Sequence, residues 1–383
     1  MASSQQAAHP SAIGSERVKP PKFHTESQFA RDLHARAQAY FAQTGLPERD
    51  VPAMRKKTVQ IWVWFLGNWA ALVFLPVPWW AKLLLALTHG VAISAIGMAV
   101  MHDANHGAYS KHPAVNRWVG YSIDCMGASS FIWRTKHNTL HHTWTNVEGV
   151  DDDLELGVLS RMSPHQRWLP FHRAQHLYMW GLYGLLVPKW ALFDDFYNIA
   201  LGRVGPLPLP KLSGRDWTVM LSGKALHLVL YFVIPLQFFS WPAVLAIYLL
   251  THAVAGVVLA VTFQLAHCVD NASFVPVPEG GRLADDWATH QLRTTVDFAP
   301  ASKPLSWLLG GLNFQVVHHL FPKVCHIHYP ALAKIVEQTA GEHGLTYLVQ
   351  PTLGGALASH YRWLKFMGER PDQRPATGAL SPA

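Results

Sequence analysis

The longest apolar runs of the chain come in two pairs, each divided by a short aromatic turn. No charged residue occurs at positions 58–81, at 83–101 or, further along, at 225–266. A membrane-spanning helix needs about 20 apolar residues, so each pair of runs is long enough for two spans. The pattern therefore predicts two transmembrane hairpins, with spans at about 58–80, 83–101, 220–240 and 243–266.

The turns and flanks of these hairpins indicate the orientation of the chain. Residues 76–80 (Pro-Val-Pro-Trp-Trp) and 240–242 (Ser-Trp-Pro) separate the spans, and tryptophan favours the membrane interface. The basic triplet at 55–57 stands directly before the first span, which places that side in the cytoplasm by the positive-inside rule. Four spans return the chain to the same side, so both termini are expected there. The alternative for the first hairpin is a deeply buried pair of helices in a soluble protein.

The regions outside the spans are more polar and set the predicted domain limits. Residues 1–57 are interpreted as a cytoplasmic N-terminal tail without a signal peptide, in which 27–44 has the spacing of an amphipathic helix. Residues 58–366 form the main domain, with a helix expected at 330–343. The stretch 367–383 is expected to be a disordered tail. The predicted fold class is all-α and membrane-integral.

Composition supports a membrane location and narrows the possible partners. Charged residues make up 14% of the 383 residues, against roughly one quarter in soluble domains. The net charge is +7, but the basic residues are scattered and match no nucleic-acid-binding motif. Anionic lipid headgroups or an acidic protein partner are therefore favoured over nucleic acid. The three cysteines show no zinc or redox spacing and indicate a reducing compartment without disulfides.

Histidines cluster where the predicted spans end. The second span runs into His-Asp-Ala-Asn-His at 102–106, and the fourth span ends at His267. Two further clusters are His-Asn-Thr-Leu-His-His at 137–142 and Gln-Val-Val-His-His at 315–319. Histidines four residues apart share one face of a helix, so the rings of one cluster can converge. The candidate ligands are His102, His106, His137, His141, His142, His267, His318 and His319, with Gln315 as a weak ligand or a hydrogen-bond partner of a ligand.

The number and type of these side chains favour two iron ions. Neutral imidazole is the commonest metal ligand, and a zinc site closes with about four ligands. The clustered histidines exceed that number, and an imidazole-rich set suits iron better than magnesium or calcium. Every cluster follows an even number of spans, so the sequence predicts a cytoplasmic helical cap that holds a di-metal site. His89 and His252 lie roughly 20 Å deeper along their helices and are expected to pack rather than bind metal.

Polar residues after the second cluster have two possible roles. Asn146 and the acidic run Asp151, Asp152 and Asp153 follow these histidines closely. They could orient ligand imidazoles by accepting a hydrogen bond from the free ring N–H, or serve as weak ligands themselves. The alternative is a solvated acidic loop that caps a helix.

The three clusters in this order resemble the histidine boxes of the membrane fatty acid desaturase family. The likeness covers about residues 58–330, with one hairpin before the first box and another between the second and third boxes. It implies a di-iron centre bound by the box histidines and by one further histidine after the fourth span, which corresponds to His267. It also implies O2 as co-substrate and the insertion of a cis double bond into a fatty acyl chain carried on CoA or a lipid.

Two details refine this resemblance. The third box begins with Gln315 where stearoyl-type enzymes have histidine. The same replacement occurs in front-end desaturases, which insert a double bond between an existing one and the carboxyl end. The polar run 146–153 is similar to that of bacterial acyl-CoA and acyl-lipid desaturases. In a bacterium, the resemblance implies a multi-pass protein of the inner membrane with its active site on the cytoplasmic side.

The resemblance also bears on the source of electrons. Many front-end desaturases carry a fused cytochrome b5 domain with a His-Pro-Gly-Gly haem motif, whereas here Ser11 follows the His9-Pro10 pair. A separate donor, cytochrome b5 or ferredoxin, is therefore implied. Arg134 and Lys136 flank the second box, so an acidic donor is expected to dock there on the cytoplasmic face.

Two other functions remain open from the sequence. Membrane hydroxylases, ketolases and alkane monooxygenases share the histidine layout but add oxygen to carbon. A membrane metal transporter or storage protein would also concentrate histidines. Transporters, however, hold ionisable ligands near the bilayer midplane, often on broken or repeated helices. Here the clusters lie at span ends and no internal repeat is evident, which favours desaturation.

Overall fold

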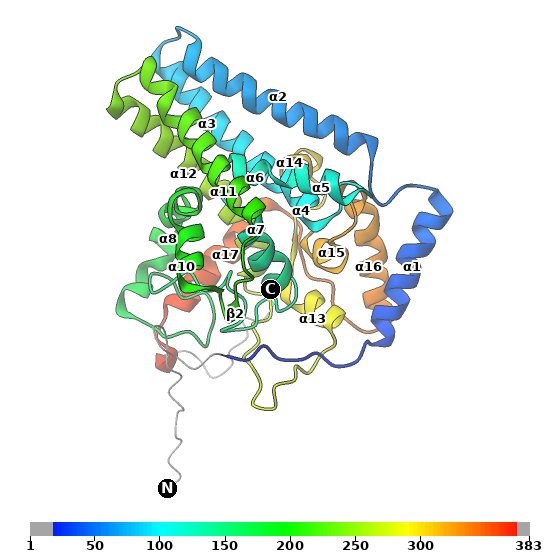
Figure 1. Cartoon of the computed structure of the whole chain (residues 1–383). Helices are drawn as coiled ribbons and strands as arrows, with labels where there is room; N and C mark the ends of the chain where they lie inside the picture. Colours follow the sequence, from blue (N-terminus) through cyan, green and yellow to red (C-terminus); the bar gives the residue numbers. More distant parts are fainter. Residues whose placement is uncertain (1–17, 374–383) are drawn as a thin grey trace.

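The computed structural model describes residues 18–373, which form an arm of long helices and a broader body of shorter ones (Figure 1). The predictions of disorder for residues 1–17 and 374–383 lie outside the described residues. Helices dominate the described chain, which agrees with the predicted fold class.

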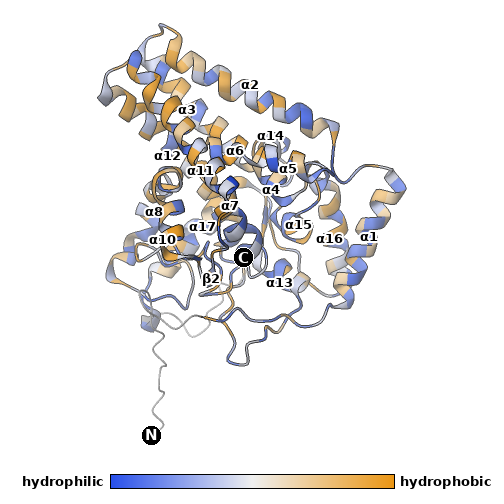
Figure 2. Ribbon diagram, viewed as in Figure 1, coloured by the Kyte–Doolittle hydropathy of each residue, from blue (hydrophilic) through white to orange (hydrophobic). Residues whose placement is uncertain are grey.

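The arm consists of two helical hairpins, as the hydrophobic pattern predicts. Hydrophobic residues are concentrated along α3 and α12 (Figure 2). The hairpin helices are α2 (Pro52–Phe74) with α3 (Trp79–Ala95), and α11 (Gly214–Leu228) with α12 (Trp241–His267). Within the described residues, three helical runs are long and apolar enough to cross a membrane: Trp79–His106, Gly214–Gln237 and Trp241–His267.

The first helix of the arm differs from the prediction. α2 begins at Pro52 rather than at about residue 58, because proline suits the first helical position. The helix therefore includes the basic triplet 55–57, and α2 is not among the three runs that qualify as spans. Lys57 from this triplet is only 3% exposed. The structure thus supports three membrane spans and leaves the fourth as a proposal.

Continuous helices lead from the arm to the histidines. α3 passes through the π-helical segment η1 (Ile96–Met101) directly into α4 (His102–His106). A π-helix has i→i+5 hydrogen bonds and is frequent at functional sites. α12 ends at His267. The helices predicted as the second and fourth spans therefore end at histidines, as expected.

The second hairpin begins earlier than predicted. α11 starts at Gly214 instead of about residue 220, because Ser213 and Asp216 form a capping box there. The helix then continues through two short segments, η5 (Val229–Val233) and η6 (Pro235–Gln237).

Short helices between the two hairpins form one side of the body. In chain order they are α5 (Pro113–Gly120), α6 (Ser122–Cys125), α7 (Ser130–Arg134), η2 (Thr135–His141), η3 (Pro170–Ala174), α8 (Gln175–Tyr183), α9 (Leu186–Lys189), η4 (Trp190–Asp194) and α10 (Asp195–Leu201). Of these, η2 and η4 are π-helical. The second histidine cluster thus lies on an unusual helix.

The chain after the second hairpin forms the other side of the body, except that its last long helix, α17 (Leu353–Gly368), packs back on α8 and η3. Its helices are α13 (Trp287–Thr294), α14 (Lys303–Leu308), α15 (Gln315–Leu320), η7 (His326–His328), α16 (Tyr329–Glu342), α17 and η8 (Pro371–Gln373). α16 agrees with the helix predicted at 330–343. The sequence reasoning did not find α13 or α17. α17 extends beyond the predicted domain limit at 366, and Met367 is fully buried in it.

The N-terminal helix α1 (Gln28–Thr44) covers this side of the body, next to α16 (Figure 1). Its buried residues Phe29 and Leu33 belong to the same hydrophobic cluster as Leu332 and Val336 of α16. The amphipathic helix predicted at 27–44 is therefore present, with Ser27 as its N-cap.

Four very short strands complete the described chain. They pair as β1 (Arg203–Val204) with β2 (Leu207–Pro208), antiparallel, and β3 (Asp297–Phe298) with β4 (Val349–Gln350), parallel. The second pair joins the loop between α13 and α14 to the chain before α17.

Candidate metal centre

The eight histidines predicted as ligands meet in the interior of the body, at the ends of the arm helices. Each is no more than 8% exposed. They come from four places in the fold: α4, η2 with the residue after it, the last residue of α12, and α15. Their ring nitrogens form overlapping groups in which all the atoms lie within 4.8 Å of one another: His102, His106, His137 and His318; His141, His267 and His319; and His142, His318 and His319.

The first group has four members and is closely packed. The Nε2 atoms of His102 and His137 are 3.2 Å apart. The ring centroids of His102 and His318 are 4.5 Å apart, and those of His102 and His106 are 4.7 Å apart. Four imidazoles around one point match the usual ligand number of a metal site.

The second group combines one histidine from each of three segments. The ring of His141 lies 4.7 Å from that of His267 and 4.9 Å from that of His319. His142 lies between the two groups, since its ring is stacked on His319 at 4.2 Å and its Nε2 is 3.2 Å from Nε2 of His137. The arrangement provides two adjacent places for a metal ion.

The π-helical form of η2 explains how one short cluster serves both groups. The prediction assumed an α-helix, in which His137 and His141 share a face, and their rings are indeed stacked 5.2 Å apart, but the helix is not of the α type. Instead, the N–H of His142 donates to the carbonyl of His137 at 3.0 Å, five residues back. This repeat of five brings His142 beside His137 and turns His141 towards the second group.

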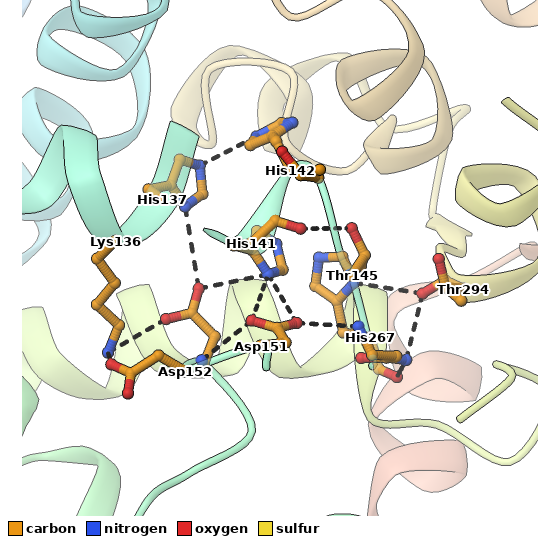
Figure 3. A network of polar contacts seen from close by, with 12 residues as sticks. Lys136, His137, His141, His142, Thr145, Asp151, Asp152, His267 and Thr294 are labelled. Atoms are coloured by element: carbon orange, nitrogen blue, oxygen red, sulfur yellow. Dashed lines mark hydrogen bonds and ion pairs between the residues drawn. The ribbon is translucent and has the colours of Figure 1, made fainter. Parts of the chain in front are cut away.

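Polar groups behind the rings fix the orientation of several histidines. Figure 3 shows the ring of His141 directed at the carboxylate of Asp151, and Nδ1 of His141 lies 3.1 and 3.2 Å from the two carboxylate oxygens. His267 Nδ1 donates to the carbonyl of Thr294 at 3.4 Å. Such contacts at Nδ1 leave Nε2 free to bind a metal and fix the ring in place.

The third box is oriented in the same manner by residues that the sequence reasoning missed. His319 Nδ1 donates to Oε1 of Gln291 at 2.8 Å, and His318 Nδ1 lies 3.1 Å from the hydroxyl of Tyr329. Gln291 lies on α13, a helix that the sequence did not predict, and no local spacing links it to the box. Tyr329 begins α16, only ten positions after His319, and its proximity in sequence was the available signal.

The acidic run after the second box divides between the two roles considered for it. Asp151 is 1% exposed, and besides His141 it accepts from the backbone N–H of Asn146 at 2.9 Å. Asp152 and Asp153 form ion pairs with Lys136 at 3.0 and 3.3 Å. Asp151 therefore orients a ring, whereas Asp152 belongs to a partly exposed charged loop.

Asp153 and Asn146 occupy different positions relative to the rings. Asp153 Oδ2 lies 3.5 Å from Nδ1 of His141 and 3.9 Å from Nδ1 of His137. The side-chain amide of Asn146 donates to the backbone carbonyls of His267 and Ser273 at 3.0 and 3.1 Å. Asn146 thus supports the backbone around His267.

Gln315 lies at the second group. Its side chain is fully buried, with Nε2 3.0 Å from Nε2 of His267 and 3.3 Å from Nε2 of His319. Its Oε1 is buried without a hydrogen-bond partner in residues 18–373. A half-turn of the amide exchanges these two atoms, which would place the oxygen among the rings.

Burial favours the neutral form of most imidazoles in the histidine groups. It lowers the pKa of His137 to about 4 and the pKa values of His142, His318 and His319 well below the ordinary value. His141 is the exception: burial acts in the same direction, but Asp151 outweighs it and raises the pKa of His141. Neutral imidazole is the form that binds metal.

Unpaired nitrogen atoms at the centre fit a bound metal. In the part of the chain that the structure describes, four ring nitrogens of the cluster are buried without a hydrogen-bond partner: His106 Nε2, His141 Nε2, His142 Nδ1 and His318 Nε2. A buried polar atom left unpaired costs about 1–3 kcal/mol. Coordination to a metal ion would satisfy these atoms, so the residues present fit such a group.

An apolar cavity in the arm approaches the first group. Its walls include Ile93 and Gly97 of the α3 run and Phe263 of α12. Trp133 also lines this cavity, and its indole ring is stacked on His137 with 4.4 Å between centroids. The cavity therefore ends one aromatic ring away from the histidines.

The fold and site together define a helical protein with membrane-type helices and a buried, histidine-rich centre that fits a metal site. Residues 76–351 match the family model for fatty acid desaturases. The chain is 41% identical over 359 residues to the sn-1 linoleoyl-lipid 6-desaturase of Synechocystis sp., covering 93% of this chain and 99% of that protein. The chain belongs to the fatty acid desaturase family and is an oxidoreductase.

Two further relatives agree with this assignment. The sn-1 linoleoyl-lipid 6-desaturase of Arthrospira platensis is 38% identical, with 90% of this chain and 94% of that protein covered. An acyl-lipid (8-3)-desaturase of Physcomitrium patens is 37% identical over 87% of this chain and 70% of that protein. The resemblance noted from the histidine boxes is confirmed.

Proposed function

We propose that the chain binds two iron ions through its eight clustered histidines and desaturates the acyl chain of a membrane lipid. The convergence of the ring nitrogens into two adjacent groups carries this proposal. The named relatives act on acyl-lipids, which favours a lipid-linked substrate over acyl-CoA. Gln315 at the head of the third box supports a front-end position for the new double bond.

The two groups assign the ligands. His102, His106, His137 and His318 would hold one ion, and His141, His267 and His319 the other, with His142 next to both. When bound, iron supplies the reaction with O2 that removes two hydrogens from an unactivated methylene pair. The overall reaction converts one O2, two electrons, two protons and a –CH2–CH2– unit into a double bond and two water molecules.

The residues of the chain position the substrate for this reaction. The apolar cavity between α3 and α12 accepts the methylene chain and excludes water, which protects a reactive centre. Trp133 separates the cavity from His137, so an acyl chain must pass its indole ring to approach the first group. Asp151, Gln291 and Thr294 hold the rings of the second group in fixed orientations.

The topology that we propose has four spans, with α2 as the first. α2 packs on α3 and contributes Ile61 and Phe65 to the main core of the arm. Its basic first turns would then lie on the cytoplasmic side, together with the cap. Epitope tags at residue 48 and at residue 77 test this arrangement, since only the second should be reached by a membrane-impermeant protease from outside the cell.

Electrons come from a separate donor in this proposal, cytochrome b5 or ferredoxin. The predicted docking residues are less free than the sequence suggests. Lys136 is paired with Asp152 and Asp153, and Arg134 donates to Asn105 Oδ1 at 3.1 Å. A donor that docks here by charge should lose rate as salt increases. Turnover that is indifferent to ionic strength would argue for another docking face.

The decisive experiment expresses the full chain in a host and compares the fatty acid methyl esters of its lipids with those from a His141→Ala variant. A new cis-unsaturated ester that is absent with the variant supports desaturation and gives the bond position. Hydroxylated esters would instead indicate a hydroxylase. No new product, despite protein that binds about two irons per chain, would contradict the proposed reaction.

A further inference from the structure

A second set of buried polar side chains lies outside the histidine groups, where α2, α4 and the turn after α15 meet. Lys57 Nζ donates to Nε2 of His326 at 2.8 Å, and Nδ1 of His326 donates to Oδ2 of Asp103 at 2.8 Å. The backbone N–H of His326 donates to the same oxygen at 3.3 Å. All three side chains are at most 4% exposed. They form a continuous line from the arm to the first box.

The charges along this line balance. A buried ammonium and a buried carboxylate are each costly alone, but a neutral imidazole that bridges them satisfies both. Lys57 also lies over the ring of Trp307, 5.4 Å from its centroid. Cys325 lies close enough to Asp103 and His326 to suggest a further metal site. The ammonium of Lys57 already occupies the place beside His326 Nε2, so a cation is present and a third metal site is not indicated.

The line joins the two segments that supply the first histidine group. Asp103 stands between the ligands His102 and His106 on α4. His326 lies on the turn that follows His318, and three residues later the hydroxyl of Tyr329 contacts His318 Nδ1 at 3.1 Å. Asp103 and His326 are 223 positions apart in the sequence. Their contact therefore sets the distance between the first and third boxes.

We propose that Lys57, His326 and Asp103 are positioning residues that hold the first and third boxes at the spacing required by the four-histidine group. This inference rests on the proposed two-metal site, but it adds a difference between the two groups. His141, His267 and His319 are oriented by Asp151, Thr294 and Gln291 instead. Breaking the line should therefore weaken one metal site and spare the other.

The test measures iron in purified full-length protein, with thermal unfolding of the metal-free form recorded alongside. Wild type should bind about two irons per chain. Lys57→Met should bind about half as much, because the carboxylate of Asp103 loses its counter-charge and the four-histidine group loosens. A merely structural residue would lower the unfolding temperature without changing the ratio of iron to folded protein.

Lys82→Met is the matched control. Lys82 is also a buried lysine of the first hairpin, 4% exposed, and donates to the carbonyls of Leu72 and Leu75 at 2.6 and 2.7 Å. Lys82 lies in the first turn of α3, and the helical run that starts there ends at the first box. Lys82 therefore lies at the far end of the arm from the histidines. This variant should lower the unfolding temperature and retain both irons.

A compensating variant keeps the test decisive if Lys57→Met does not fold. In Lys57→Met/Asp103→Asn the amide oxygen still accepts from His326 Nδ1 and no unpaired charge remains, so folding and the second iron should return. The inference is overturned if Lys57→Met binds as much iron as wild type, if it loses iron from both sites equally, or if the double variant recovers nothing. A wild-type protein with fewer than two irons would instead contradict the two-metal proposal itself.

Discussion

Two buried clusters of histidines occur in this molecule, and they differ in what the second ring nitrogen contacts. Among the proposed ligands, His141, His267 and His319 place Nδ1 against Asp151, Thr294 and Gln291. In the arm, His89 and His227 direct Nε2 to the hydroxyls of Tyr231 and Tyr248, at 3.1 and 3.2 Å. Both clusters are buried, so burial and composition alone do not separate a metal site from a packing cluster.

Convergence is what distinguishes the two clusters. Nitrogens of the cap histidines lie within 4.8 Å of one another in groups of three or four, and among the described residues the arm histidines join no such group. His252 instead donates to the carbonyl of Tyr248, 2.8 Å away on its own helix, and its ring packs on the tyrosine at 4.0 Å. Each arm histidine thus pairs one ring nitrogen with a hydroxyl or carbonyl group, while Nδ1 of His89 and of His227 have no hydrogen-bond partner among the described residues.

The difference between the two clusters is tested most directly by replacing histidines of each cluster with alanine. His267→Ala removes a member of the three-histidine group and should abolish desaturation and lower the iron content, as should His141→Ala. His252→Ala and His89→Ala should keep about two irons per folded chain, whatever they do to stability. Iron analysis of purified protein with activity in the same preparations makes the measurement.

Two results would contradict this prediction for the His267 and His252 variants. Full iron occupancy in His267→Ala would remove it from the site, and loss of iron in folded His252→Ala would extend the metal centre into the arm.

A smaller effect is expected from the acceptors behind the rings. Asp151→Asn keeps the shape of the side chain but weakens the hydrogen bond to His141 Nδ1 and removes the buried charge. Loss of such a partner typically reduces metal affinity roughly 10- to 100-fold. Titration of the metal-free variant with Fe(II) should show weaker binding at one site. Asp152→Asn is the matched control, since Asp152 pairs with Lys136 and should leave both affinities unchanged.

The sequence was informative about which histidines converge and less so about what orients them. The hydrophobic runs located the hairpins, and the ends of the second and fourth runs placed His102 and His267 together. The π-helical turn of η2 was not visible, because its effect on His141 and His142 depends on a hydrogen-bond register that residue spacing does not fix. Gln291 was missed since its partner, His319, is 28 positions away and only tertiary packing brings them together.

Gln315 offers a finer test within the cap. Its amide lies 3.0 Å from His267 Nε2, where an oxygen ligand weaker than imidazole would reach the second group. Gln315→Ala should lower activity more than Gln315→Asn or Gln315→His, and iron loss should follow the same order. Normal desaturation by Gln315→Ala would show that the position only packs against the rings.

Asp297, which accepts a hydrogen bond from Val316 in the third box, should make the stability of the protein depend on pH. Burial raises the pKa of Asp297 to about 7, although hydrogen bonds from Tyr347 and from the N–H of Val316 act in the opposite direction. The folded protein therefore retains a proton that the unfolded chain releases near its ordinary pKa of 3.8. This stabilisation is complete below about pH 4 and is lost as the pH rises to about 7.

Asp297→Asn should remove this dependence. Unfolding temperatures of the metal-free protein in detergent, measured between about pH 5 and about pH 8, should fall more steeply for wild type than for the variant. An equal slope in both proteins would show that another group controls the pH response.

The smallest expected effect comes from the arm. Tyr231→Phe removes the hydroxyl that contacts Nε2 of His89 and leaves the aromatic packing in place. The loss of one buried hydrogen bond should cost about 1 kcal/mol of stability, with no change in iron content, because no metal depends on His89. Replacing His89 with Phe in the Tyr231→Phe background removes the unpaired nitrogen and should recover part of that loss. If Tyr231→Phe instead lowers the iron content while the protein stays folded, the arm cluster is coupled to the metal centre, and the separation drawn between the two histidine clusters does not hold.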